Sequence, residues 1–73
     1  MRVTYDAEAD MAYIQLVERI EPGEAVRQVP AGDGTTAVLD FDAEGRLLGV
    51  ELSGAARTLH PDLMAAAGKA GRD

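Results

Sequence analysis

The sequence predicts an α+β fold: a small antiparallel β-meander of about five strands, with one short C-terminal helix packed on a face. Short runs of β-branched, aromatic and leucine residues recur between breaks rich in Gly, Pro and Asp. These breaks are too short to hold crossover helices. Helical spacing of apolar residues begins only at Leu59. The chain of 73 residues has room for one domain; we expect it to span residues 1–68, with 69–73 as a frayed tail.

The first two predicted strands occupy residues 2–5 and 11–17, where β-branched, aromatic and aliphatic residues concentrate. A helix over residues 7–16 is the alternative, because Ala, Glu and Met favour helices. The strand is preferred because the run ends in a Glu-Pro-Gly turn at residues 21–23 and has no helical cap.

Three further strands are predicted at residues 25–29, 36–41 and 46–52. The first of them is weak, is expected at an edge of the sheet, and is expected to end at Pro30. Because the connections are short, each strand is expected to pair with the next one along the chain.

Two turns share one sequence pattern, an aromatic residue followed by Asp-Ala-Glu, at residues 5–8 and 41–44. We expect the same hairpin in both places, with the aromatic ring packed inward and the Asp side chain accepting hydrogen bonds from turn amides. Gly45 closes the second turn and is expected to adopt a positive φ.

The C-terminal helix is predicted from its ends. Pro61 suits the first helical turn, Asp62 complements the helix dipole, and Gly68 with Lys69 marks the end. An apolar stripe at helical spacing consists of Leu59, Leu63, Met64 and Ala67.

The composition excludes several classes of function. There are 13 acidic against seven basic residues, for a net charge of −6, and the bases are dispersed. We therefore expect no nucleic-acid binding by the protein itself and no attraction to anionic membranes, whereas a basic protein partner is compatible. The absence of Cys excludes disulfides and thiolate metal sites. No apolar run is long enough to span a membrane, and the first residues do not form a secretory signal.

One motif resembles a calcium-binding loop, with Asp40, Asp42, Glu44, Gly45 and Glu51 at its first, third, fifth, sixth and twelfth positions. Glu replaces Asp or Asn at the fifth position, and the flanks read as strands, whereas an EF-hand needs helices. A hairpin turn explains the same residues without metal, so no metal ligand is assigned here.

A second group of carboxylates, Asp6, Glu8 and Asp10, alternates along the chain. In a strand these side chains would share a face and could hold Mg²⁺ or Ca²⁺. Since no His or fourth ligand accompanies them, a solvated turn is the preferred interpretation.

The inventory for nucleophilic catalysis is one Ser and one His, Ser53 and His60, with Asp62 as a conjectural orienting acid. No elbow motif surrounds Ser53, and His60 before Pro61 is more typical of a helix cap or surface residue. Gly32 and Gly34 precede a predicted strand, so they cannot present a helix N-terminus to phosphate. We assign no catalytic residue, no metal ligand and no cofactor, and expect no enzyme.

Two longer segments resemble the signatures of a family of small bacterial proteins, the domain of unknown function two-two-eight-three. These segments are Tyr5-Asp6-x-Glu8-Ala9-Asp10-x-x-Tyr13-Ile14-x-Leu16 and Val38-Leu39-Asp40-Phe41-Asp42-x-x-Gly45-Arg46-Leu47-x-Gly49-Val50-Glu51. The resemblance covers about residues 1–57. It implies a compact sheet-plus-helix domain, a cytoplasmic location in bacteria, and no activity. Some members are encoded beside small toxins, which implies an antitoxin role as an alternative.

The function expected overall is that of a non-enzymatic protein-interaction module that forms a homodimer. The alternation predicts apolar residues on both sides of the strands, and one helix covers only one face. A partner copy is therefore expected to bury the rest. Tyr13 or Leu16 is expected in that interface; for Tyr5, Tyr13 and Phe41 alike, core or interface packing is preferred to base stacking. The alternatives are an antitoxin that binds a basic toxin, and a divalent-metal protein or metal-dependent enzyme that uses the acidic turns.

Overall fold

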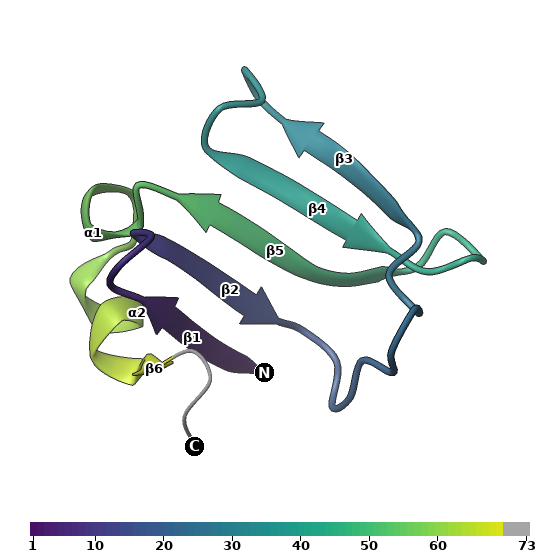
Figure 1. Ribbon diagram of the computed structural model, residues 1–73, viewed down its shortest axis with the longest axis horizontal. Coiled ribbons are helices and arrows are strands. Elements are labelled where there is room, and N and C mark those ends of the chain that lie inside the picture. Colours follow the sequence, from purple (N-terminus) through teal and green to yellow (C-terminus); the bar gives the residue numbers. More distant parts are fainter. Residues whose placement is uncertain (70–73) are drawn as a thin grey trace.

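The structure, a computed structural model, describes residues 1–69, in which six strands form one sheet and two short helices lie between the fifth and sixth strands along the chain (Figure 1). The elements are β1 (Arg2–Asp6), β2 (Met11–Gln15), β3 (Arg27–Ala31), β4 (Ala37–Phe41), β5 (Leu47–Ser53), α1 (Ala55–Thr58), α2 (Pro61–Ala66) and β6 (Gly68–Lys69). The α+β class and the five antiparallel strands are as predicted. The expected tail falls mostly in residues 70–73, outside the described residues.

The strand order is β3-β4-β5-β2-β1-β6, which corrects the predicted meander. Each of β1/β2, β3/β4 and β4/β5 pairs as expected, but β2 pairs with β5 and not with β3. The segment of residues 16–26 is long enough to leave the sheet after β2. This segment carries β3 to the far edge, and β2 instead pairs with β5, with Ile14 opposite Val50.

The edge position predicted for the third strand is confirmed, although Pro30 lies inside β3 and does not end it. Pro30 has no N–H to donate, a loss that an edge strand tolerates. Its Cα partner on β4 is Val38.

The single predicted helix is two helices, α1 and α2. α1 follows Gly54, whose φ of +63° is in the left-handed region, and the chain becomes extended at Leu59. α2 begins at Pro61 as expected but ends at Ala66, before the predicted end at Gly68. It stops there because Ala67 is extended, and Gly68–Lys69 then runs parallel to β1 as β6.

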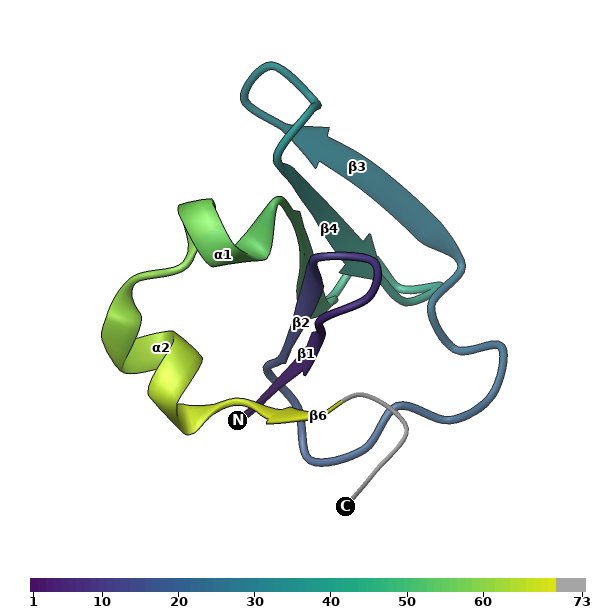
Figure 2. The ribbon, with the colours of Figure 1, turned by 60° about the vertical axis from the view of Figure 1, so that its left-hand side comes forward.

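The buried core lies between the helices and the β1–β2 part of the sheet. Val3, Ala12, Ala55 and Leu59 form a buried cluster. The partly buried residues that pack against it are Tyr5, Ile14, Leu52, Leu63, Met64 and Ala67. Figure 2 shows both helices on the same side of β1 and β2, while β3 and β4 extend away from them.

The strand register divides the sheet into two chemically different faces, because residues paired across antiparallel strands point to the same side. The face that includes the buried cluster, called the apolar face, carries Val3, Tyr5, Ala12, Ile14, Val29, Ala31, Ala37, Leu39, Phe41, Leu48, Val50 and Leu52. Arg27, whose guanidinium lies over the Phe41 ring, is its one charged residue within β1 to β5. The opposite, polar face carries Arg2, Asp6, Asp40 and Glu51 among its residues. The polar face also carries Met11, Tyr13 and Val38, so apolar and aromatic residues do occur on both sides of the sheet, as expected, but on this face they alternate with charged residues.

Candidate functional site

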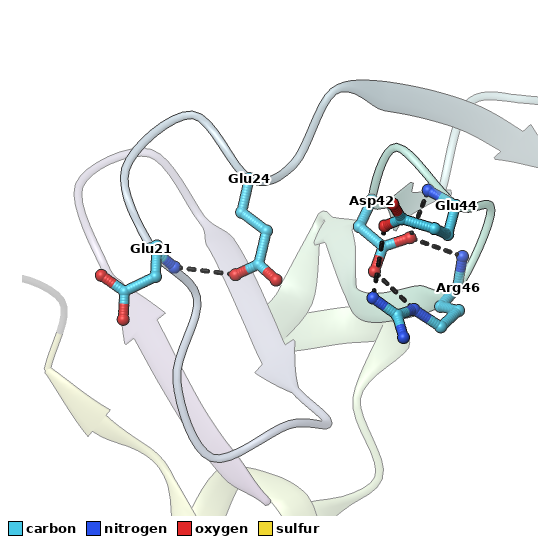
Figure 3. Close-up of polar contacts among 5 residues, drawn as sticks. All are labelled: Glu21, Glu24, Asp42, Glu44 and Arg46. Carbon is cyan, nitrogen blue, oxygen red and sulfur yellow. Dashed lines mark hydrogen bonds and ion pairs between the residues drawn. The ribbon is translucent and has the colours of Figure 1, made fainter.

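The turn between β4 and β5 is organised by the carboxylate of Asp42, which is only 5% exposed. Its Oδ1 accepts hydrogen bonds from the backbone N–H groups of Glu44 (3.0 Å) and Arg46 (2.8 Å). Its Oδ2 accepts from Arg46 Nε at 2.8 Å (Figure 3). Gly45 has a φ of +79° and donates its N–H to the Asp42 carbonyl. The predicted turn and its positive-φ glycine are confirmed.

These contacts favour the ionised form of the Asp42 carboxyl. The backbone N–H of Arg46, followed by its guanidinium, lowers the pKa of the Asp42 carboxyl against the opposing effect of burial. Arg46 also reaches Glu44 Oε1 at 3.3 Å. Because the Arg46 guanidinium already contacts both carboxylates, a divalent cation at this turn would face a competing positive charge.

The other carboxylates of the calcium-loop pattern lie on the polar face, where Asp40 accepts a hydrogen bond from the Tyr13 hydroxyl at 2.9 Å. Glu51 is placed opposite Val38 and Tyr13 in the ladders. Among residues 1–69, the structure brings together no group of three or more His, Cys, Asp or Glu side chains that could hold a metal ion.

The turn between β1 and β2 repeats the Asp-amide arrangement, as its sequence predicts. Asp6 Oδ1 accepts from the backbone N–H groups of Glu8 (3.1 Å) and Ala9 (3.3 Å). Asp10 has a different role: its φ is +52°, an unusual value for a residue other than glycine. Asp6 and Asp10 are therefore parts of a hairpin turn.

Asp10 joins this hairpin to the start of α1. Its Oδ1 accepts from the Tyr5 hydroxyl (3.1 Å) and the Ala56 N–H (2.9 Å), and its carbonyl accepts from the Ala55 N–H (3.0 Å). The hydrogen bond to Asp10, more than any other cause, raises the pKa of Tyr5. Sequence reasoning missed this helix-capping role because the contact spans 46 residues.

A second tyrosine–aspartate pair crosses three strands on the polar face. Tyr13 on β2 lies over Gly49 on β5 and donates to Asp40 on β4. A Cβ at Gly49 would collide with the Tyr13 ring and hydroxyl, so the fit requires glycine. Burial, followed by the hydrogen bond to Asp40, raises the pKa of Tyr13. The three residues are called the Tyr13 clasp below.

The candidate nucleophile and base have structural roles. His60 is the N-cap of α2, as expected, and its Nδ1 accepts from the Asp62 N–H at 3.0 Å. The Ser53 carbonyl accepts from Thr58 Oγ1 at 3.2 Å. In the described part of the chain, no hydrogen bond joins Ser53 to His60. Residues 32–34 form the turn before β4, with no helix to follow.

A further apolar surface is the part of the apolar face that lies away from the buried cluster. It is made by β3, β4 and β5, and is called the open face; its residues are Val29, Ala31, Ala37, Leu39 and Val50. All five are half-buried, and none belongs to the buried cluster or packs against it. Sequence reasoning missed the open face because the weak pattern of the third strand does not reveal its register with the fourth. The signal that was present is the alternation of Ala37 and Leu39 with Val38 and Asp40.

No helix within residues 1–69 is long and apolar enough to cross a membrane. No curated protein and no solved structure matches the chain. The model of one family, described as protein of unknown function (DUF2283), matches residues 2–55. This range contains β1 to β5, both Asp turns and the Tyr13 clasp. Since the match covers most of the 73 residues, the chain belongs to this family of unknown function.

Proposed function

We propose that the protein is a non-enzymatic interaction module that acts as a homodimer. The observation that carries this proposal is the open face, a half-buried apolar surface of three strands that the chain's own helices do not pack against. Monomeric proteins rarely leave large contiguous apolar patches in water, and such patches mark interaction sites.

The non-enzymatic part of the proposal is supported by what the polar signature residues do. The carboxylates of Asp6, Asp10, Asp40 and Asp42 all accept hydrogen bonds from groups of the chain itself. A catalytic acid or base must instead reach a proton of the substrate. These side chains stabilise two turns, a helix start and a three-strand contact.

The dimeric part is supported by shape. The molecule is a slab of 32 × 31 × 20 Å. A compact monomer of 7.7 kDa is expected to expose about 4300 Å², whereas this chain exposes 4996 Å². A flat molecule of this kind leaves more surface in water than a compact monomer, which favours burial against a partner.

The test is a mass measurement by light scattering at micromolar concentration. We expect a mass about twice 7.7 kDa, together with a melting temperature that rises with protein concentration, because dimerisation stabilises by mass action. A chain that stays at 7.7 kDa and melts cooperatively at a concentration-independent temperature would refute the homodimer.

An antitoxin-like role toward a basic protein is the second candidate. The observation in its favour is the net charge of −6, with the acidic residues of the sheet on the polar face. Such a complex should form with a basic neighbouring gene product and weaken steeply as salt is raised. Affinity that does not depend on salt would exclude this electrostatic mode.

A further inference from the structure

We propose that the second copy of the chain docks on the open face, so that the two sheets pack face to face around a two-fold axis. The inference rests on the proposed homodimer and specifies its surface. Each copy would present the same β3–β4–β5 surface, as a closed two-fold interface requires.

The first argument is the pattern of side-chain size on this face. The ladders align Val29, Leu39, Val50 and Ile14 in one row across four strands. The neighbouring row is Ala31, Ala37, Leu52 and Ala12. On the open part of the face, large side chains therefore form a ridge beside a lower strip of alanines. A copy turned by 180° can place its ridge over the partner's alanines, with sheets about 10 Å apart.

The second argument is charge. The chain has 13 acidic residues, yet none of those in β1 to β5 lies on the apolar face. Two copies that each carry a net charge of −6 can therefore meet there without bringing carboxylates together. The acids remain at the rim and on the polar face, where water and salt screen their repulsion.

The same charge pattern argues against a basic partner on this surface. A basic protein would find no carboxylate among the five residues of the open face, and its own cations would lose water without compensation. The polar face is the surface that carries Asp40 and Glu51, so it is the one suited to a cation-rich partner. A second copy of the chain would bring an equally apolar surface of the same size, related by a two-fold axis.

The direction of the chain after α2 shows that residues 67–69 do not cover the open face. From Ala67 the backbone is extended, and Gly68 lies beside Thr4 of β1, at the edge of the sheet opposite to β3. Leu63 and Met64 pack against the buried cluster. The described helices therefore pack on the part of the sheet that holds the buried cluster. The open face is left for a partner from another molecule.

The disruption experiment uses two neighbouring residues of β4 that point to opposite faces. Leu39 and Val38 are both half-buried, and Leu39 lies on the open face. By light scattering at micromolar concentration, Leu39→Asn is expected to shift the wild-type dimer to monomer, while Val38→Asn stays dimeric. Circular dichroism and thermal melting check that both variants fold.

The crosslinking experiment gives a positive readout that does not need a disrupted interface. The chain has no cysteine, so single-cysteine variants report one contact each. Val29→Cys on the open face and Gln28→Cys on the polar face lie next to each other in edge strand β3. With a short bis-maleimide, Val29→Cys is expected to form a covalent dimer at least tenfold faster than Gln28→Cys.

The outcomes separate the inference from the proposed function. A wild-type monomer would remove the homodimer and this interface together. A wild-type dimer with equal crosslinking at the two cysteines, or with a Leu39→Asn variant that stays dimeric, would overturn the open face alone. If Leu39→Asn fails to fold, the crosslinking rates decide.

Discussion

The two ends of the sheet solve the problem of burial differently. At β1 and β2, Ala55 of α1 and Leu59, the residue that follows α1, are 0% and 5% exposed and belong to the core. At β3 and β4, the apolar side chains of the open face remain half-buried and lie outside the buried cluster. One end therefore resembles a small domain with its own core, and the other resembles half of an interface.

The largest expected effect distinguishes burial at the two ends. Leu59→Ala removes a side chain from the buried cluster and should lower the free energy of unfolding by about 2–5 kcal/mol. Leu39→Ala should cost less than about 2 kcal/mol in the isolated monomer, because the side chain is already half in water. Urea unfolding of dilute protein measures both values. Equal losses would contradict the contrast between the two ends.

The Tyr13 clasp connects the two ends, and its glycine is the next test. Gly49→Ala forces the Tyr13 ring away from Asp40, at an expected cost of about 1–3 kcal/mol. In a Tyr13→Ala background the same substitution meets no ring, so its cost should fall. A double-mutant cycle by chemical denaturation measures the difference. Additive losses would mean that the ring does not restrict residue 49.

A pair of glycines compares a turn at the open end with the segment after the helices. Gly45 has a φ of +79°. Gly68 has no positive φ, and a Cβ added to it would have no other atom within 4 Å. Gly45→Val should therefore lower stability by roughly 1–3 kcal/mol, and Gly68→Val by clearly less. Thermal melts under identical conditions report the order. Equal melting temperatures would be incompatible with strain at Gly45.

The smallest effect concerns acid and the turn of Asp42. Because the folded-state pKa of Asp42 is lowered, its ionised form contributes stability above the ordinary carboxyl pKa, about 3.9, and that contribution is lost as pH falls through the folded value. The stability difference between wild type and Asp42→Asn should therefore be constant from neutral pH to about 4 and shrink below it. A difference that stays constant in stronger acid would show that ionisation of Asp42 does not support the turn.

Local chemistry made several features predictable from the sequence. Gly45, Asp42 and Asp6 act within a few residues of their own positions, so the turn pattern was sufficient to predict them. His60 and Pro61 predicted the start of α2 for the same reason. The five strands could likewise be predicted from their side-chain composition.

Long-range contacts explain the errors. Pairing of β2 with β5 depends on which strand offers the better apolar partner across the whole chain, and strand spacing carries no information on it. The Tyr13–Asp40 contact and the helix cap by Asp10 span 27 and 46 residues. Which residues share a face could be inferred only from the strand register. The register places Tyr13 on the polar face, whereas the proposed interface is the open face.

Both borders of the sheet limit growth of the strand ladder. On one border, Pro30 in β3 removes a backbone donor. On the other, Gly68–Lys69 already occupies part of β1 as a parallel partner. A further chain that tried to extend the sheet as an added strand would find an interrupted template at either border. Any association is thereby directed to the faces of the sheet, which favours finite assemblies over fibres.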